Sequence, residues 1–324
     1  MMTVGMTKLD RLQHSKKETT AMKRIAMGSW AYAIGPYEKE PIDFDTVCRK
    51  VKELGFDGVE LGAFSPHPNP DDMPQKSQRN ELVGKMKDWG LEFAGMGANL
   101  WGRRLLNTDD PKTYVAEFTK AADFCADLAI KTLRLDTVQP PTIFEQVDYQ
   151  TAFGRLTQTW KRCSELAADR GLIVTWEFEP GFAFNKPSDI VRVLDAVDKP
   201  NFGVLLDTCH AQMVSVVGAR QPGEKETLPG GPLELIGMLH GRINHIHLID
   251  SDNTCHKNAD GSDETSAHPP FGLGVLDFDQ IAPALAAENL PDDWWTIDLC
   301  FWPNAWEATA ACKKFVDGLN EKYG

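Results

Sequence analysis

Hydrophobic positions along the chain alternate between two spacings. Short, nearly continuous apolar runs recur from residue 24 onward, and between them apolar residues fall three or four positions apart. The short runs predict eight strands, at residues 24–30, 58–64, 93–100, 132–138, 173–179, 202–208, 243–250 and 294–301. The helical spacing predicts amphipathic helices between and after them, for example at residues 44–54, 114–128, 149–168, 188–197, 278–288 and 306–319.

This strand and helix alternation is typical of the α/β class. Eight repeated strand–helix units predict a closed (β/α)8 TIM barrel that forms a single domain over residues 22–324. An open doubly wound sheet has no support, because no GxGxxG follows the first strand and no GxxxxGK[ST] occurs anywhere. Residues 1–21 are polar and lack the apolar stretch of a signal peptide, so we expect a disordered leader or an over-extended start there.

Two segments after predicted strands are long. Residues 209–231 are rich in Gly and Pro, and residues 251–276 are crowded with Asp, His, Ser, Gly and Pro. Reactive groups of such barrels lie at the carboxyl ends of the strands, and long loops at that end are commonly functional. We therefore expect both segments to lie over the reactive end of the barrel, and residues 251–276 to act as a lid.

Charge and cysteine content narrow the functional class. The 324 residues include 34 Lys and Arg against 47 Asp and Glu, a net charge of -13, which disfavours a nucleic-acid partner. No stretch is apolar enough to span a membrane, so no membrane partner is expected. The seven cysteines are scattered without a CxxC pair, which favours reduced thiols and a cytoplasmic location over a disulfide framework or a zinc ribbon.

Polar residues stand at matching positions near the ends of the last four predicted strands. These are Glu177, Asp207, His247 and Asp298. One acid at a strand end commonly caps a loop, but four such residues in register would converge above the barrel. Three carboxylates and one imidazole suit a single divalent metal ion. Mn²⁺ is the first expectation, and Mg²⁺, Co²⁺ or Zn²⁺ are alternatives.

The motifs around these residues resemble those of a known family. WEFEPGF, PNFGVLLDTCH, HIHLID, FGLGVLDFD and WWTIDLCFW, with GFDGVEL near the second strand, are similar to the xylose-isomerase-like barrels, also called the AP-endonuclease family 2. The likeness extends over residues 24–319, and the family includes sugar isomerases, ketose epimerases, inosose dehydratases and inosose isomerases. Its Glu, Asp, His, Glu metal ligands fall on Glu177, Asp207, His247 and Asp298, where Asp298 departs by being one methylene shorter.

The resemblance also implies roles for two further histidines. His210 lies where ketose epimerases have a His that contacts substrate oxygens, although the second Glu and the Arg of those enzymes are replaced by Ala183 and Asn253. His268 lies where the endonuclease branch has a metal-binding His, and we place it among the substrate-contacting residues. That branch needs further histidines on the second and third strands. Here His67 is the only histidine near the second strand and the third strand has none, so a three-metal site cannot be completed and DNA repair is disfavoured.

Aromatic residues gather near the predicted strand ends. Trp30, Trp101 and Trp302 could stack on the C–H faces of a sugar, and packing within the barrel explains them equally well. Trp176 alternates outward from Glu177, so we expect it to pack against a helix.

Together these residues predict a metal-dependent sugar isomerase or epimerase acting on a ketose or keto-sugar. It would remove the proton α to the carbonyl through a metal-stabilised enediolate, with Glu177 as base, Asp298 as its partner and His210 as a substrate contact or proton donor. The same intermediate serves a keto-sugar or inosose dehydratase, or a lyase that cleaves a 3-keto glycoside. An alternative of another class is a non-catalytic sugar-binding or partner subunit, and a homo-oligomer is left open.

Overall fold

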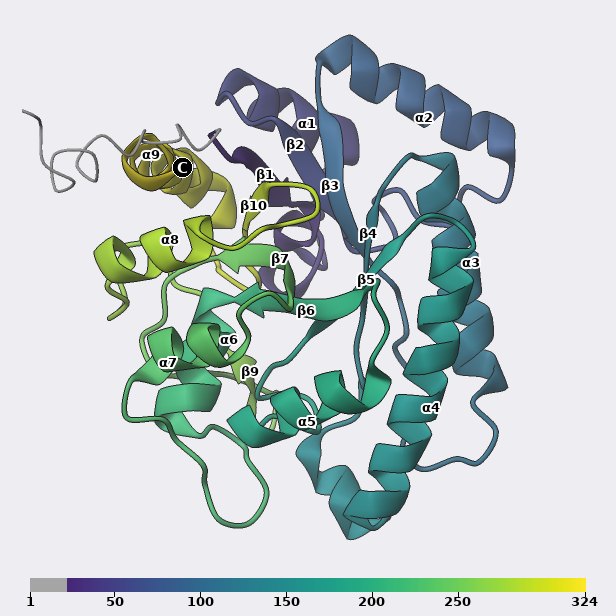
Figure 1. Ribbon diagram of the computed structural model, residues 1–324. Helices are drawn as coiled ribbons and strands as arrows, with labels where there is room; N and C mark the ends of the chain where they lie inside the picture. The colour runs from purple at the N-terminus through teal and green to yellow at the C-terminus, as the bar shows by residue number, and fades with distance from the viewer. Residues whose placement is uncertain (1–21) are drawn as a thin grey trace, which may run out of the picture.

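Eight parallel strands close into a barrel in the computed structural model, which describes residues 22–324 (Figure 1). The expected leader, residues 1–21, lies outside the described residues. Around the barrel the order is β1-β10-β7-β6-β5-β4-β3-β2, so the first and last strands pair and every strand has two neighbours. The strands are β1 Arg24–Gly28, β2 Gly58–Leu61, β3 Glu92–Gly97, β4 Thr132–Leu135, β5 Ile173–Glu177, β6 Phe202–Asp207, β7 Ile243–Leu248 and β10 Trp294–Ile297. The predicted (β/α)8 barrel of one domain is confirmed.

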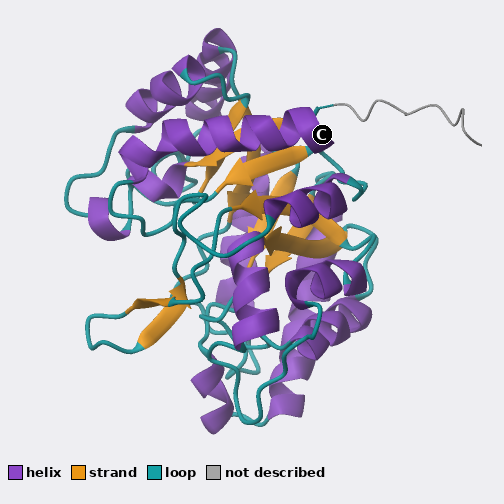
Figure 2. Ribbon diagram, turned by 90° about the vertical axis from the view of Figure 1, so that its left-hand side faces the viewer, coloured by secondary structure: helices purple, strands orange, loops and turns teal. Residues whose placement is uncertain are grey.

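Helices surround the barrel on its outer side (Figures 1 and 2). They are α1 Phe44–Glu53, α2 Lys76–Trp89, α3 Lys112–Asp127, α4 Tyr149–Ala168, α5 Pro187–Val197, α6 Thr208–Gln212, α7 Gly231–Met238, α8 Phe278–Ala286 and α9 Ala305–Tyr323. Short 3-10 segments occupy Ser29–Tyr32, Gly35–Tyr37 and Pro141–Glu145, and a π-helical turn occupies Met213–Val217. Among the described residues no helix is both long and apolar enough to cross a membrane.

Helix α4 illustrates how the sequence pattern becomes packing. Asp148 caps its start by accepting a hydrogen bond from the backbone N–H of Thr151. Its buried Trp160 lies 5.2 Å, centroid to centroid, from the ring of Trp176 on β5 and 5.8 Å from that of Phe202 on β6. The expected outward orientation of Trp176 is therefore observed, and these rings join the helix layer to the barrel wall.

Three parts of the fold depart from the expected pattern. Helix α2 had no clear apolar stripe, since only Leu82 and Met86 on it are buried. Residues 209–231 do not form one long loop, because α6 and the π-helical turn occupy 208–217. Residues 251–276 contain an antiparallel hairpin, β8 Cys255–Lys257 and β9 Asp263–Ser266, which projects from the barrel in Figure 2.

Candidate metal centre and pocket

Four side chains converge at the carboxyl end of the barrel. Glu177 and Asp207 are the last residues of β5 and β6, His247 lies near the end of β7, and Asp298 follows β10 directly. The strand register aligns Asp207 with His247, which places them at one height in the barrel. One ligand atom from each of the four residues lies within 4.8 Å of the others, and all four are buried. The convergence expected from the strand ends is therefore observed.

The facing atoms of this cluster fit a cation. Within the described chain, Glu177 Oε1, Asp207 Oδ2 and His247 Nδ1 are buried and have no hydrogen-bond partner. His247 Nδ1 lies 3.2 Å from Glu177 Oε1 and 3.6 Å from Asp298 Oδ2. Leaving several buried polar atoms unpaired is costly, and carboxylate oxygens with an imidazole nitrogen suit a divalent metal. The donor set therefore fits a divalent metal ion.

The remaining oxygens of two of these carboxylates are held by neighbouring groups. Asp298 Oδ1 accepts hydrogen bonds from Trp30 Nε1, at 2.9 Å, and from the backbone N–H of Cys300, at 2.8 Å. Glu177 Oε2 is paired with the guanidinium of Arg134 on β4, whose other arm lies 3.1 Å from Asp136 Oδ2. In both Glu177 and Asp298, one oxygen is therefore anchored and the other faces the common centre.

The negative charges within the cluster perturb one another. Burial, together with the nearby Asp298 and Glu177, raises the pKa of Asp207 well above its ordinary value. Burial would also raise the pKa of Glu177, but Arg134 and His247 outweigh it and lower that pKa to about 2. Glu177 is therefore a carboxylate that holds its negative charge firmly, as a ligand should.

A second polar group lies beside the four ligand candidates. Glu179 Oε2 accepts a hydrogen bond from Thr265, and His210 Nδ1 lies 2.8 Å from Ser266 Oγ, so both contacts come from β9. His210 Nε2 lies 4.0 Å from Glu179 Oε2. Burial and then the charge of Glu177 raise the pKa of Glu179 to about 8, and burial and then His268 lower the pKa of His210 to about 3. At neutral pH, Glu179 is therefore a carboxyl group that can hold a proton, and His210 is a neutral imidazole.

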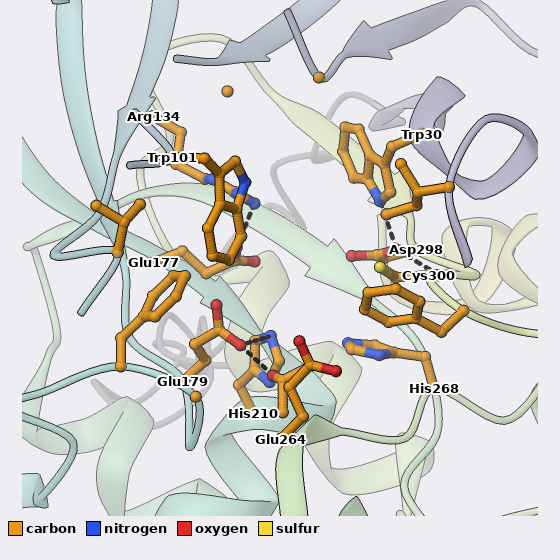
Figure 3. Close-up of a pocket in the computed structure, with 18 of the residues that line it drawn as sticks. Trp30, Trp101, Arg134, Glu177, Glu179, His210, Glu264, His268, Asp298 and Cys300 are labelled. Atoms are coloured by element: carbon orange, nitrogen blue, oxygen red, sulfur yellow. Dashed lines mark hydrogen bonds and ion pairs between the residues drawn. The ribbon is translucent and has the colours of Figure 1, made fainter. Parts of the chain in front are cut away.

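One pocket, with a volume of about 340 Å³, is lined by Glu177, Glu179, His210 and Asp298 (Figure 3). Asp207 and His247 are buried and are not among its lining residues. Arg134 and Glu177 stand on one side of it in the figure, and Trp30 and Asp298 stand on the other. The hairpin contributes further lining residues, Asn258, Glu264 and Thr265. The segment 251–276 therefore lies at the reactive end of the barrel, as expected of a lid.

The expected substrate-contacting residues separate into two groups. Trp30, Trp101 and His268 line the pocket, and Trp101, 60% exposed, packs its ring edge-on against Phe182 at 5.6 Å. Trp302 is not part of the lining formed by the described residues, where its neighbour Phe301 stands instead. Trp302 is partly buried and packs against the hydrophobic core, so the structure favours packing over the equally weighted substrate contact.

Three polar residues inside the barrel were not identified as part of the site from the sequence. Arg134 and Glu60 each interrupt an otherwise apolar strand, a signal that was available in TLRL and GVEL. The ring of His245 also lies inside the barrel, with Nε2 2.7 Å from Glu60 Oε2. The reason is the two-residue period of a strand, which gives His245 the same face as His247.

Comparison with known proteins agrees with this fold. Residues 48–314 match the sequence profile of the family described as xylose isomerase-like TIM barrel, and the chain belongs to that family. An inosose dehydratase of Bacillus thuringiensis (strain Al Hakam) is 22% identical over 299 residues, covering 87% of this chain and 90% of the relative.

Solved structures share the fold. A crystal structure of the IolI protein with a bound zinc atom has a TM-score of 0.68 at 16% identity, covering 93% of this chain and 99% of that one. The 3-keto-D-glucoside 4-epimerase YcjR of E. coli has a TM-score of 0.63 at 14% identity, covering 93% of this chain and 100% of that one. Dehydratases and epimerases therefore both occur among proteins similar to this chain.

Proposed function

We propose that this protein is a divalent-metal-dependent enzyme that removes the proton α to the carbonyl of a small keto-sugar or keto-cyclitol and then expels water from the neighbouring carbon. One observation carries the proposal: two of the four converging donors, Glu177 and Asp298, line a pocket together with Glu179, a buried carboxyl group whose pKa is raised to about 8. The inosose dehydratases similar to this chain over most of its length support elimination as the outcome.

The metal ion would be held by Glu177, Asp207, His247 and Asp298, all of which are buried, and Glu177 and Asp298 also line the pocket. When bound, it supplies positive charge that stabilises the negative charge developing on the substrate's carbonyl oxygen. The aromatic walls, Trp30 and Trp101, would contact the apolar C–H faces of the substrate.

Glu179 is the better candidate for proton transfer than Glu177. Both oxygens of Glu177 are committed, one to Arg134 and one to the ligand cluster, and its pKa of about 2 makes it a weak base. Glu179 has one oxygen bonded to Thr265, and no hydrogen bond from a described residue is found at the other. A pKa near the working pH suits a group that must both take and return a proton.

Glu179 alone can carry the one proton that the elimination of water has to move. Glu179 takes the α-proton, a carbon–carbon double bond forms next to the carbonyl, and the departing hydroxyl receives the proton and leaves as water. His210, with a neutral imidazole 4.0 Å from Glu179, would contact a substrate oxygen. Asp298, expected as a second proton-transfer group, has one oxygen occupied by two donors and serves as a ligand in this proposal.

Epimerisation is the second candidate, and one observation favours it. Glu177 and Asp298 stand on opposite sides of the pocket in Figure 3, the arrangement that removal of a proton from one face and delivery to the other requires. Isomerisation of a ketose would use the same first step.

Proton NMR in D2O distinguishes these reactions. The metal-loaded protein is incubated with inososes, free ketoses and 3-keto glycosides, and both α-proton exchange and products are followed. We expect exchange with loss of water from a keto-cyclitol or keto-sugar. A new diastereomer without loss of water would indicate epimerisation, and sugar binding without exchange would indicate a non-catalytic subunit.

A further inference from the structure

A buried carboxylate lies on the inner side of the ligand cluster, away from the pocket. Glu60, on β2, does not line the pocket, and its side chain is 2% exposed. Its Oε1 lies 3.2 Å from His247 Nε2, and its Oε2 lies 2.7 Å from both His245 Nε2 and Thr296 Oγ1. Glu60 therefore joins β2 to β7 and β10 across the barrel interior.

These contacts decide which nitrogen of His247 carries a proton. An ionised carboxylate can only accept hydrogen bonds, so the groups that surround Glu60 must donate to it. His247 then holds a proton on Nε2 toward Glu60. In its neutral form this leaves the Nδ1 lone pair directed at Glu177 and Asp298, where Nδ1 has no hydrogen-bond partner among the described residues.

We propose that Glu60 is a positioning residue that fixes the ring and tautomer of His247 so that Nδ1 faces the metal. This inference rests on the proposed metal centre, because the ion itself would contact His247 and not Glu60. A carboxylate behind a metal-binding imidazole holds the ring in place and raises its basicity.

The barrel wall is shaped to admit this carboxylate. The β2–β3 register shifts between Val59 and Glu60, so Glu60 pairs with Gly95. A Cβ on Gly95 would lie 3.2 Å from both Cδ and Oε1 of Glu60 and 3.5 Å from His245 Nε2. Glycine at position 95 therefore leaves the space in which the carboxylate sits.

The same three residues could in principle hold a cation of their own, since Glu60, His245 and His247 offer ligand atoms close together. Here those atoms bond one another, and Thr296 adds a further donor to Glu60. The network is thus satisfied without a second ion, and the stoichiometry of metal binding tests this point.

The test uses Glu60→Gln and Gly95→Ala in the full chain. A Gln side chain has one acceptor oxygen for two histidines and Thr296. The methyl group added by Gly95→Ala crowds the carboxylate, since its nearest neighbours would be atoms of Glu60 and His245. The zinc dissociation constant is measured by competition with a chelator, with Thr132→Val as the control, a buried barrel position whose hydroxyl has no partner among the described residues. Loss of an outer partner typically weakens metal binding by about 10-fold to 100-fold. We expect losses of that size in both variants and less than about threefold in the control.

The second measurement is 15N NMR of the imidazoles, with and without zinc. In the wild-type protein His247 Nε2 should keep its proton in both states, and zinc should perturb Nδ1. The role of Glu60 would be overturned by either of two NMR results, zinc bound to His247 Nε2 or an Nε2 without a proton. It would also be overturned if zinc affinity were unchanged in both variants, or if the wild-type protein bound two zinc ions and Glu60→Gln lost one of them. Failure of the wild-type protein to bind zinc would instead overturn the metal centre, while the metal-free spectrum would still report on Glu60.

Discussion

Glu177 and Glu179 are two positions apart on one chain segment, and their surroundings differ. Arg134 neutralises Glu177, whereas Glu179 receives only a hydroxyl hydrogen bond from Thr265 and lies near the charge of Glu177. The pKa values therefore separate, to about 2 for Glu177 and about 8 for Glu179. Two carboxyl groups whose pKa values are pushed apart by their environments commonly take different roles in one site.

Replacing each residue by its amide tests this division. Glu179→Gln should lower α-proton exchange at saturating metal by about 100-fold to 10,000-fold, because general acid–base catalysis contributes that much, and should leave metal affinity nearly unchanged. Glu177→Gln should mainly weaken metal affinity, as should Asp207→Asn. α-Proton exchange is measured by NMR at increasing metal concentration. Added metal should restore exchange in the variants that bind metal weakly, but not in Glu179→Gln. Full exchange in Glu179→Gln, with none in Glu177→Gln at saturating metal, would restore Glu177 as the base.

At the scale of elements, the β8–β9 hairpin joins the lid segment to the reactive groups. Thr265 and Ser266 of β9 bond Glu179 and His210. Farther out, His256 on β8 stacks on Phe301 with ring centroids 4.4 Å apart. The hairpin therefore lines the pocket and contacts the residue proposed to transfer the proton.

Shortening this hairpin should damage catalysis but not metal binding. Replacing residues 256–264 by a two-residue Asn-Gly turn removes Asn258 and Glu264 from the pocket and keeps all four candidate ligands. We expect kcat/KM to fall at least about tenfold, because a lid excludes water and positions the substrate. Asp260→Ala is the control, since Asp260 is exposed and bonds only Ser262 of the same hairpin. An unchanged kcat/KM in the shortened protein would refute a lid role.

The strands were predictable because each falls in a short, nearly continuous apolar run, and the eight expected ranges each overlap one barrel strand. Helix α2 was not, because it has no clear apolar stripe and only Leu82 and Met86 on it are buried. Four candidate ligands were visible at strand ends. The roles of Glu60 and Arg134 were hidden, because their partners lie on other strands and only the closed barrel brings them together.

For the whole molecule, the four candidate ligands lie on or directly after β5, β6, β7 and β10, which are neighbours in the barrel. An ion bound there would connect four strands that the unfolded chain does not hold together. Metal binding should therefore stabilise the fold, and the stabilisation should depend on metal concentration.

A ligand that binds only the folded state at 100 times its dissociation constant adds about 2.7 kcal/mol to the free energy of unfolding. For a chain of this size each kcal/mol raises Tm by roughly 2 °C, so the metal-free protein should gain about 5 °C when Mn²⁺ is restored. Calorimetry of chelator-treated protein, titrated with Mn²⁺, Mg²⁺, Co²⁺ and Zn²⁺, measures the shift and ranks the ions.

Asp207→Asn should show a smaller shift in Tm at the same metal concentration, whereas Thr132→Val should respond like the wild-type protein. If Asp207→Asn gained as much as the wild-type protein, the stabilising ion would lie at another site, because Asp207 is buried among the other three ligands and faces them directly.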